Sequence, residues 1–500
     1  MSVAGSEEIG RQSVVAGMPA WLWVGVAVGL LMMLSGNALL NDPDMFWQIK
    51  VGQWIVDHGA VPHVDIYSFS KAGTPWISSS WLAQVLFAYV YGIGGWGGVV
   101  ALAAIMIAAT LALLVYLLDR HLPSRYSCLI AMVALALASQ HMLARPHVLV
   151  IPIMVVWFDG LIVASDRRVA PSLWLLPLIV LWANLHGSFI LGLALLAPTM
   201  FDAMWQAPAL QRRKLAGRWI AFGIAAVVTA CATPYGWQSL WAAKNILDLG
   251  PALSLISEWA PPNFSRFEAF EIVIMLLATA ALWRGVRLPL PRIVLVLGFL
   301  HMALSHVRNV EVFALLTPLA LAGPVAHQFG WTGAHTTNNV MPRSWSAALV
   351  ALLLAVAIGW NALYPRHFQP NRDTMPTAAV AVLKDRKATR VFNDYNFGGY
   401  LIWAGVAPFF DGRTELYGVQ FSQDVFAAQA LRRPDLLLSL LERYRIDATL
   451  LAPTTPAAIL MDHLEGWTRV YADDKAVVHM RTSEAGNTEN PAPARPIKAQ

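Results

Sequence analysis

The feature that most constrains this chain is a series of apolar runs, separated by short polar segments. About 20 apolar residues suffice for a helix to span the hydrocarbon core of a bilayer. Because 57% of the 500 residues are hydrophobic and only 13% are charged, the composition is too apolar for a soluble protein of this length. The sequence therefore predicts an α-helical integral membrane protein with about 11 transmembrane helices, beginning near residues 20, 97, 126, 147, 172, 187, 217, 270, 291, 310 and 345.

The distribution of Lys and Arg predicts how these spans are oriented. Every second loop is basic, and cytoplasmic loops of membrane proteins are enriched in basic residues. The basic loops are Arg120 to Arg125, Arg167 and Arg168, Arg212 to Arg218, Arg284 to Arg292, and Arg343. Residues 1–19 are then a cytoplasmic N-terminal segment. The net charge of +5 reflects orientation in the membrane, and no nucleic acid partner is expected.

The composition changes near residue 365, where a polar linker follows the last apolar run. Residues 20–365 form the predicted transmembrane domain, and residues 366–482 a small extracytoplasmic α/β domain. In that domain, strands are expected near 390–392, 400–403, 449–451 and 476–479, and helices near 376–385, 424–431 and 434–443. Residues 483–500, rich in Gly, Asn, Glu, Pro and Ala, are typical of a disordered tail.

The first outer loop, residues 41–96, is too long for a plain connector. Trp47, Val51 and Ile55 fall on one helical face and Lys50 on the opposite one, which predicts an amphipathic helix at the membrane surface. A second amphipathic helix is expected from Trp81 to Tyr91, behind three serines that offer an N-cap.

Two carboxylates, Asp42 and Asp44, directly follow the first span. One interpretation is that Asp44 caps the amphipathic helix by accepting hydrogen bonds from free backbone amides. Two carboxylates at a membrane boundary also suit a general base for an acceptor hydroxyl, or a site for a divalent cation such as Mg²⁺ or Mn²⁺. For a metal, the candidate ligands are Asp42, Asp44 and His186.

Two polar segments interrupt apolar runs on the same predicted face. QHMLARPH contains His141, Arg145 and His147. Its arginine either reaches the lipid headgroups or binds a lipid-linked phosphate. WANLHGSF, with Asn184 and His186, is expected to form a turn between two spans. Its imidazole either fills polar space or contacts a sugar hydroxyl or phosphate, and the cost of ionisable groups at this depth favours function.

Three further segments complete the candidate substrate site. Tyr235 in TPYG and Trp259 in ISEWAPPNF suit either the aromatic belt or stacking on a sugar ring. Arg308 and Glu311 in SHVRNVEVF suit either an intrahelical ion pair or an arginine that binds phosphate. The expected substrate-binding residues are Lys50, Arg145, His147, Asn184, His186, Tyr235, Glu258, Trp259, Arg308 and Asn309.

Together these features resemble the GT-C class of membrane glycosyltransferases, which use polyprenyl-phosphate sugars as donors. The resemblance is carried by the acidic motif after the first span, the long first outer loop, about a dozen spans and the outer C-terminal domain. The segments DPDMFWQIKVGQWIVDHGAVPHVD, WANLHGSF, FGGYLIW and DGRTELYG look like a bacterial group described as glycosyltransferase-like membrane proteins.

That resemblance implies an inverting transfer of a hexosyl or pentosyl group to a glycan or lipid acceptor, outside the bacterial inner membrane. The family's acidic residue, as base or metal ligand, falls here on Asp42 or Asp44. The partners implied are membrane lipid, a polyprenyl-phosphate-linked sugar and the acceptor. A long acceptor-recognition motif of the oligosaccharyltransferase type is not visible, so a peptide acceptor is not expected.

Two other functions are open to a multi-pass chain. A lipid or glycan transporter or flippase would place ionisable residues near the membrane midplane and often contains internal repeats, and neither is evident in the sequence. A non-catalytic assembly protein of the cell envelope would use the outer domain as a docking surface. In that domain, FFDGRTELYG supplies either local turns, with Asp411 beside Arg413, or a cover over the membrane site.

Overall fold

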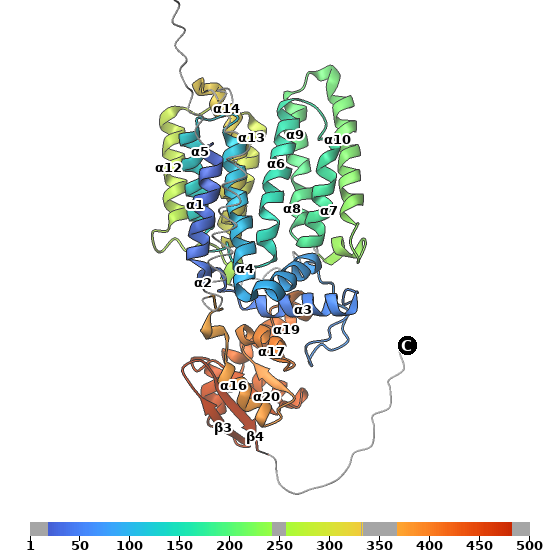
Figure 1. The fold of residues 1–500 in the computed structure, drawn as a ribbon, viewed down its shortest axis with the longest axis vertical. Helices are drawn as coiled ribbons and strands as arrows, with labels where there is room; N and C mark the ends of the chain where they lie inside the picture. Colours follow the sequence, from blue (N-terminus) through green and yellow to red (C-terminus); the bar gives the residue numbers. More distant parts are fainter. Residues whose placement is uncertain (1–18, 243–256, 332, 334–367, 483–500) are drawn as a thin grey trace, which may run out of the picture. The chain divides into compact units, whose positions relative to one another are not determined.

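The structure is a computed structural model that describes residues 19–242, 257–331, 333 and 368–482 (Figure 1). It contains two compact units. The first comprises the chain up to Ile66, Lys71–Met375 and Arg413–Ser422; the second comprises Tyr67–Ser70, Pro376–Gly412 and the chain from Gln423. The span expected near residue 345, the tail 483–500 and residues 1–18 of the expected cytoplasmic segment lie outside the described residues.

The first unit is a bundle of helices that lie side by side, and α3 runs across their ends (Figure 1). Its helices are α1 (Ala20–Leu34), α2 (Gly36–Leu39), α3 (Asp44–His58), α4 (Trp81–Leu118), α5 (Ser124–Ala138), α6 (Ile151–Asp166), α7 (Leu176–Leu185), α8 (Phe189–Ala194), α9 (Leu196–Gln206), α10 (Ala209–Ala230), α12 (Ala269–Arg284), α13 (Leu290–Ser305) and α14 (Val310–Phe329). Short 3-10 turns η1 (Pro146–Leu149), η2 (Leu173–Leu175), η4 (Ser257–Trp259), η5 (Val307–Asn309) and η7 (Arg372–Thr374) connect or follow them.

By length and composition, three helices in the described part of the chain can cross a membrane: Trp81–Leu118, Phe189–Gln206 and Val307–Phe329. Four shorter apolar helices accompany them, Ala20–Leu34, Ser124–Ala138, Leu173–Leu185 and Leu290–Ser305. A helix is also present at each of the other predicted spans within the described residues. The predicted total of about 11 spans stays a prediction.

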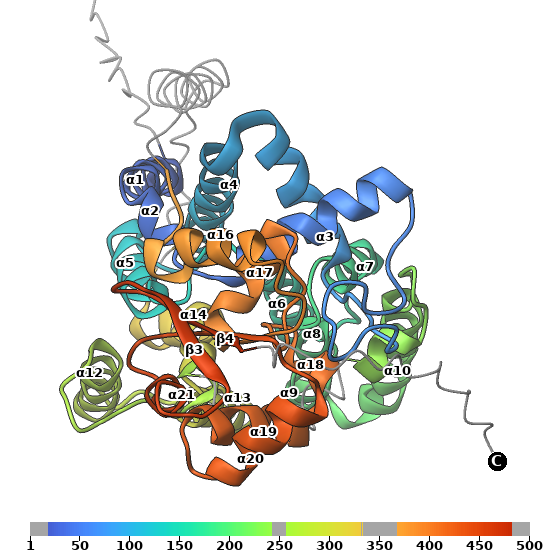
Figure 2. The same cartoon turned by 90° about the horizontal axis from the view of Figure 1, so that it is seen from below.

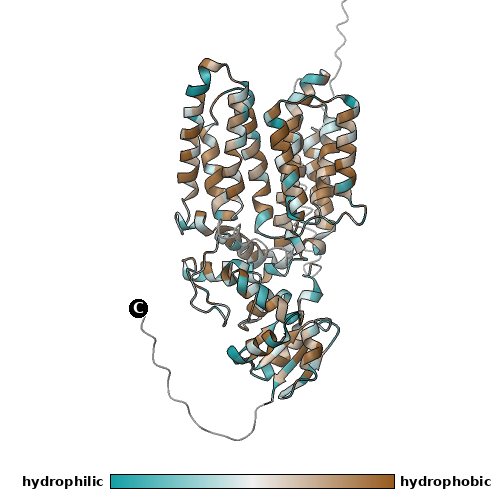
Figure 3. Ribbon diagram, turned by 180° about the vertical axis from the view of Figure 1, so that it is seen from behind, coloured by the Kyte–Doolittle hydropathy of each residue, from teal (hydrophilic) through white to brown (hydrophobic). Residues whose placement is uncertain are grey.

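The outer surface of the bundle is apolar, as Figure 3 shows along most helices. On α12, for example, Leu276, Leu282 and Trp283 are 63%, 85% and 82% exposed, and Phe270 is its buried aromatic residue. Contiguous exposed apolar surface of this kind is unfavourable in water and is neutral against lipid tails. The bundle is therefore built for a hydrocarbon environment.

The first outer loop contains the two helices that the sequence predicts. The first is α3, whose buried residues are Met45, Phe46, Trp47, Gln48, Ile49, Val51, Gly52 and Ile55. The second begins at Trp81 as expected but is continuous with the following span, with one non-helical residue, Gly95, between them. Ser80 occupies the N-cap position, although its side chain makes no capping hydrogen bond. The serines serve instead to hold the loop, since Ser78 Oγ donates to Gln84 Oε1 at 2.7 Å.

The break between α7 and α8 confirms the turn predicted at Asn184 to Ser188. The α7 helix ends at Leu185, and His186 has an extended backbone (φ −164°, ψ 141°). The Trp182 indole donates to Ser188 Oγ at 2.9 Å across this turn. The His186 ring is thereby presented at the end of the two helices rather than along one of them.

The second unit contains a four-stranded sheet with the order β1-β2-β4-β3. The strands are β1 (Val391–Asn393), β2 (Ala448–Leu451), β3 (Trp467–Ala472) and β4 (Val477–Arg481); β1 pairs with β2 in parallel and the other pairs are antiparallel. Figure 2 shows β3 and β4 side by side. Strands β1 and β2 are buried throughout, whereas β3 is largely exposed, which places the core at the inner strands.

The helical elements after residue 375 are α16 (Thr377–Asp385), η8 (Tyr395–Phe397), α17 (Gly398–Ala404), α18 (Thr414–Tyr417), α19 (Val419–Gln429), α20 (Pro434–Arg443) and α21 (Pro456–Met461). Of these, α18 and the start of α19 belong to the first unit. The predicted strand at 400–403 is wrong, because this segment forms α17. Gly398 explains the change: a Cβ there would overlap the backbone at Phe410 and Asp411, so α17 begins where the chain packs closely on itself. Strand β3 was not anticipated, because its exposed residues lack a clear apolar alternation.

Candidate active site

Five segments that are distant in the sequence meet at the α3 end of the bundle. Asp42 lies between α2 and α3, Arg145 precedes η1, and Glu258 lies in η4. The backbone places the first two together, because Ala144 N donates to the Leu39 carbonyl at 2.8 Å. The side chains that gather there are Asp42, His141, Arg145, His147, His186, Glu258, Trp259, Arg308 and Glu311, which we call the outer cluster.

Arg145 is the centre of the outer cluster. Its Nη1 atom lies 3.2 Å from Asp42 Oδ2 and 2.5 Å from Glu258 Oε1. Burial alone would lower the pKa of this guanidinium, but the two carboxylates outweigh that effect and raise the pKa. Arg145 therefore carries a permanent positive charge that is already balanced by two anions.

The two carboxylates respond differently to the same arginine. Burial raises the pKa of Asp42, and Arg145 together with the Asp44 amide offsets only part of this rise. Burial also acts to raise the pKa of Glu258, but Arg145 overcomes it and holds the pKa below its usual value. Asp42 is therefore the better proton acceptor, and Glu258 the more firmly ionised partner.

Asp42 supplies a carboxylate that accepts from the first amide of α3. Asp44 N donates to Asp42 Oδ1 at 2.8 Å, and Asp44 is itself the first residue of the helix. Asp44 is therefore inside the helix and not at its N-cap position. The reason is that Pro43 stands at the N-cap position with helical backbone angles, so the preceding aspartate folds back onto the first free amide.

Three histidines, of which His141 is buried and His147 and His186 are half-buried, lie among the carboxylates and arginines. Burial is the main cause that lowers the pKa of His141, and it lowers the pKa of His147 and His186 well below the usual value. All three rings are therefore neutral at pH 7. The His147 and His186 ring centroids lie 6.5 Å apart, and His147 Nε2 lies 3.6 Å from Glu311 Oε2, too far for a hydrogen bond.

Several buried nitrogen atoms of the outer cluster have no hydrogen-bond partner among the described residues. These atoms are both ring nitrogens of His141, both ring nitrogens of His147, and Nε of Arg145. Buried donors are almost always satisfied in folded proteins, and unsatisfied ones are costly. Their concentration around one pair of carboxylates indicates a place that receives a polar ligand or water.

Arg308 is the arginine whose charge is not balanced by a direct ion pair. Its guanidinium carbon lies 4.4 Å from the Trp259 ring centroid, and in the described chain it makes no ion pair within 4 Å. The expected Arg308–Glu311 ion pair is therefore absent. Two contacts hold η4 against η5: Val307 N donates to the Ala260 carbonyl, and the His306 ring approaches the Trp259 carbonyl at 2.6 Å.

Other expected site residues make structural contacts. The Tyr235 hydroxyl donates to the Pro62 carbonyl at 2.8 Å and accepts from Ser78 N at 3.2 Å. Burial raises the pKa of Tyr235 to about 12, so it stays a neutral donor. The Asn184 amide donates to the Val180 and Ala232 carbonyls and accepts from the Trp81 indole. Both residues hold the first outer loop on the bundle.

Lys50 and Asn309 are less closely tied to the cluster. Lys50 is half-buried on α3, and no hydrogen bond or ion pair of its side chain occurs among the described residues. Asn309 Nδ2 donates to the Met302 carbonyl at 3.2 Å. His141, Glu311 and His306 were not among the predicted binding residues. The only sequence signal for them was a polar side chain near the end of an apolar run.

The arrangement does not fit a resident metal ion. Within the described ranges, no group of three or more His, Cys, Asp or Glu side chains is placed to hold one. Asp42 Oδ2 faces the Arg145 guanidinium at 3.2 Å, so a cation at Asp42 would have to displace Arg145.

No protein-family model matches the chain, and no curated protein matches its sequence. Solved structures are similar to it at low identity. One is the archaeal oligosaccharyltransferase AglB from Archaeoglobus fulgidus, in complex with an inhibitory peptide and a dolichol-phosphate. It is 11% identical, with a TM-score of 0.49, covering 86% of this chain and 69% of that one.

ArnT from Cupriavidus metallidurans is also similar. The apo structure is 13% identical with a TM-score of 0.45, covering 94% of this chain and 99% of that one. The structure bound to undecaprenyl phosphate is 12% identical with a TM-score of 0.41, covering 95% and 100% of the two chains.

Proposed function

We propose that the chain is a membrane glycosyltransferase that moves a sugar from a polyprenyl-phosphate donor to a hydroxyl of an extracytoplasmic glycan or lipid. The observation that carries the proposal is the outer cluster itself. A buried carboxylate with a raised pKa stands beside buried donors and an arginine that have no hydrogen-bond or ionic partner, respectively, in the described part of the chain. The sequence resemblance supplies the donor class, to which the dolichol phosphate and undecaprenyl phosphate of the solved structures above also belong.

Arg308 is the proposed site for the donor phosphate. Arg145 is already balanced by Asp42 and Glu258, so it has little charge to offer an incoming anion. The Arg308 guanidinium lies over the Trp259 ring and makes no ion pair among the described residues, and the neutral rings of His147 and His186 can add hydrogen bonds from their N–H groups. Arginine–phosphate hydrogen bonds are charge-assisted and orient the leaving group.

Asp42 is the proposed base. The acceptor hydroxyl attacks the anomeric carbon, its proton passes to the Asp42 carboxylate, and the bond from the anomeric carbon to the phosphate oxygen breaks. The electron pair leaves with the polyprenyl phosphate, whose charge Arg308 stabilises. Attack opposite the leaving group inverts the anomeric centre. Arg145 keeps Asp42 ionised and in place through the 3.2 Å contact.

The extracytoplasmic location follows from the alternation of basic loops and stays a proposal. If it is right, the outer cluster faces away from the cytoplasm in the inner membrane of a bacterium. A reporter fused after Arg168 should then behave as cytoplasmic, and one fused after Pro370 as exported. The reverse pattern would place the cluster on the wrong side for the proposed acceptor.

The test of the reaction compares cells that lack the chain with cells that carry Asp42→Asn, Asp44→Asn or Asp57→Asn. Surface glycans are profiled by mass spectrometry, and membrane levels of each variant are measured in parallel. We expect the deletion and Asp42→Asn to lose the same glycan signal. Asp57 is exposed on the same helix, so Asp57→Asn is the matched control and should keep it. Normal glycans with Asp42→Asn, against a loss in the deletion, would exclude Asp42 as the base.

A further inference from the structure

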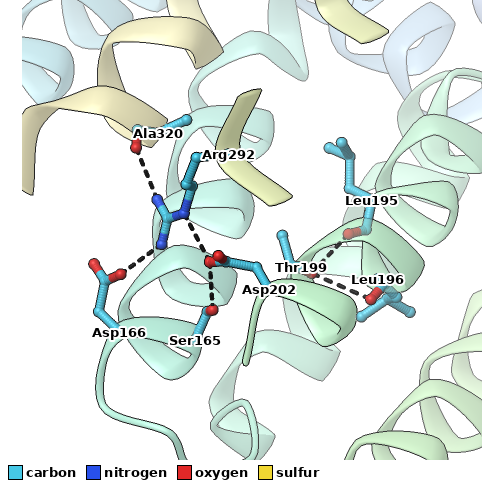
Figure 4. Close-up of polar contacts among 8 residues, drawn as sticks. All are labelled: Ser165, Asp166, Leu195, Leu196, Thr199, Asp202, Arg292 and Ala320. Carbon is cyan, nitrogen blue, oxygen red and sulfur yellow. Dashed lines mark hydrogen bonds and ion pairs between the residues drawn. The ribbon is translucent and has the colours of Figure 1, made fainter. Parts of the chain in front are cut away.

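A second buried polar cluster lies at the other end of α6 from the outer cluster. Asp166 ends α6, whereas His147 precedes it, so about 24 Å of helix separates them. In this cluster Arg292, which is 1% exposed, binds two carboxylates and one carbonyl (Figure 4). Its Nε lies 2.7 Å from Asp202 Oδ2, its Nη2 lies 2.5 Å from Asp166 Oδ1, and its Nη1 donates to the Ala320 carbonyl at 2.8 Å.

These contacts join four helices at one point. Arg292 is on α13, Asp166 on α6, Asp202 on α9 and Ala320 on α14, and Ser165 Oγ adds a hydrogen bond to Asp202 at 2.6 Å (Figure 4). Buried charges that are paired and hydrogen-bonded in this way hold helix ends in a fixed arrangement. These contacts, which we call the Arg292 network, therefore fix the four helices relative to one another at this point.

A cavity of about 630 Å³ adjoins the Arg292 network, since Asp166 belongs to both. Another cavity, of about 660 Å³, lies elsewhere in this unit. The wall of the cavity at the Arg292 network is built by the ends of several helices and by the loops after α4 and α12. The lining residues are His121, Asp166, Gln206, Arg287, Pro289, Gly323, Pro324, His327 and Gln328. Its volume falls in the range of about 300–1,000 Å³ that is usual for ligand sites.

Three side chains of the cavity wall, each cationic or protonatable, are available to bind an anion. The side chains of His121, Arg287 and His327 make no hydrogen bond or ion pair with another residue in the described part of the chain. Asp166, the acidic residue of the wall, is held by Arg292. The nearby Arg120 forms an ion pair with Asp159. The donors that face the cavity are therefore positive or neutral, and the adjacent anion is already paired.

Gly323 keeps the cavity open. A Cβ at this position would lie 3.8 Å from both His121 Cε1 and Asp166 Oδ2, which is ordinary contact. A larger side chain would extend from there into the space between the His121 ring and the Asp166 carboxylate. Further basic residues follow α6 (Arg167 and Arg168), lie in the first turns of α10 (Arg212, Arg213 and Lys214) and end α12 (Arg284).

We propose that this cavity binds the phosphate headgroup of an anionic phospholipid, such as phosphatidylglycerol, from the leaflet that the basic loops face. The shared chemistry is a phosphate group recognised by Arg287 and the two imidazoles. A lipid is favoured over a free phosphate because the lining residues lie at the ends of apolar helices, and Leu290, the neighbour in sequence of the lining residue Pro289, is 52% exposed. Basic pockets between membrane helices on that face are a recognised kind of headgroup site.

The test uses the full chain purified into nanodiscs that contain equal amounts of phosphatidylglycerol and phosphatidylcholine, followed by native mass spectrometry of the ejected protein. We expect phosphatidylglycerol to be retained preferentially. Arg287→Gln should lower that retention about fivefold, as expected for one basic residue at an anionic surface. Arg284→Gln is the matched control, because Arg284 lies three residues earlier in the sequence, over the Phe329 ring, and does not line the cavity.

A second variant leaves the charges intact. Gly323→Val should fill the cavity and lower phosphatidylglycerol retention, while Gly323→Ala should keep it. Separate samples contain inorganic phosphate or glycerol phosphate at millimolar concentration. Retention of inorganic phosphate without any preference for phosphatidylglycerol would overturn the lipid assignment. An equal loss in Arg284→Gln and Arg287→Gln would overturn the cavity as its site, because general surface attraction would then explain the binding.

Discussion

Arg413 and Asp65, 348 residues apart in the sequence, form an ion pair of 2.6 Å in which neither side chain is exposed. Arg413 also lies over the Trp76 ring at 4.9 Å, and the Trp76 indole donates to Glu415 at 3.1 Å. The segment Arg413–Ser422 thus belongs to the first compact unit and holds its first outer loop. The acidic residues at the start of α3 lie in that loop, so a segment from late in the chain supports the candidate site.

Arg413→Met should destabilise the first unit by about 3–5 kcal/mol, because it leaves the Asp65 carboxylate buried without its cation. Thermal and chemical unfolding of the protein in detergent will measure the loss. Arg433→Met is the control: Arg433 is 58% exposed and lies 3.7 Å from Asp435. Such an exposed pair contributes about 0–1 kcal/mol. Equal effects of the two variants would contradict the structural role of the buried pair.

Gly52→Ala should weaken the contact between α3 and α4. A Cβ on Gly52 would overlap the Gln84 backbone and lie 2.8 Å from the Ala88 Cβ, so one helix has to move. Overpacking of this kind costs about 1–3 kcal/mol in the free energy of unfolding. Gly92→Ala is matched to it, because nothing lies within 4 Å of a Cβ there. We expect that control to be neutral or slightly stabilising in the same unfolding measurement.

Arg145→Met should shift the pH dependence of the proposed transfer. Burial already raises the pKa of Asp42, and Arg145 is the largest of the effects that lower it. Without the arginine the pKa of Asp42 rises further, so its carboxylate becomes protonated at a higher pH. The acidic limb of the pH–rate profile therefore shifts to higher pH. A nearby opposite charge changes such a pKa by about 1–3 units. A profile measured on membranes that stays at its parent position would exclude Arg145 as the group that keeps Asp42 ionised.

Arg308→Gln should affect donor use without that pH shift. If Arg308 binds the donor phosphate, its loss raises the donor KM and lowers the rate by about 10²–10³-fold, as for other groups that stabilise a developing charge. The acidic limb should remain near its parent position, because the main causes of the Asp42 pKa shift do not include Arg308. If Arg308→Lys keeps part of the transfer activity that Arg308→Gln loses, the positive charge at this position contributes to the reaction.

Asp394→Asn tests the second unit. Burial is the main cause of the raised pKa of Asp394, whose carboxylate accepts from Asn396 N at 3.0 Å. A raised native pKa means that the stabilising protonated form is present at low pH and is lost as pH rises through that pKa. Asn keeps an oxygen acceptor and carries no charge. Hydrogen exchange of the β1 and β2 amides should therefore show a smaller loss of protection between pH 4 and pH 7 than in the parent.

Much of the first unit was predictable because its signals are local. An apolar run of sufficient length indicates a helix wherever it lies in the sequence. The starts of α3 at Asp44 and of α4 at Trp81 likewise follow from the residues around them. The turn at His186 was predicted for the same reason, since a polar Asn-Leu-His-Gly segment interrupts apolar residues. The strand expected at 400–403 failed because a short apolar run suits both a strand and a buried helix, and close packing at Gly398 decides between them.

The candidate residues of the site could be identified from the sequence, because each is a polar or aromatic residue beside an apolar run: Asp42, Arg145, His147, His186, Glu258, Trp259 and Arg308. Their contact partners could be identified only from the folded chain. Asp42 rather than Asp44 accepts the amide of α3, and Arg145 is balanced while Arg308 has no ion pair among the described residues. The physical reason is that hydrophobic periodicity depends on neighbours along the chain. Electrostatic pairing depends on distances of a few ångströms between segments that folding alone brings together.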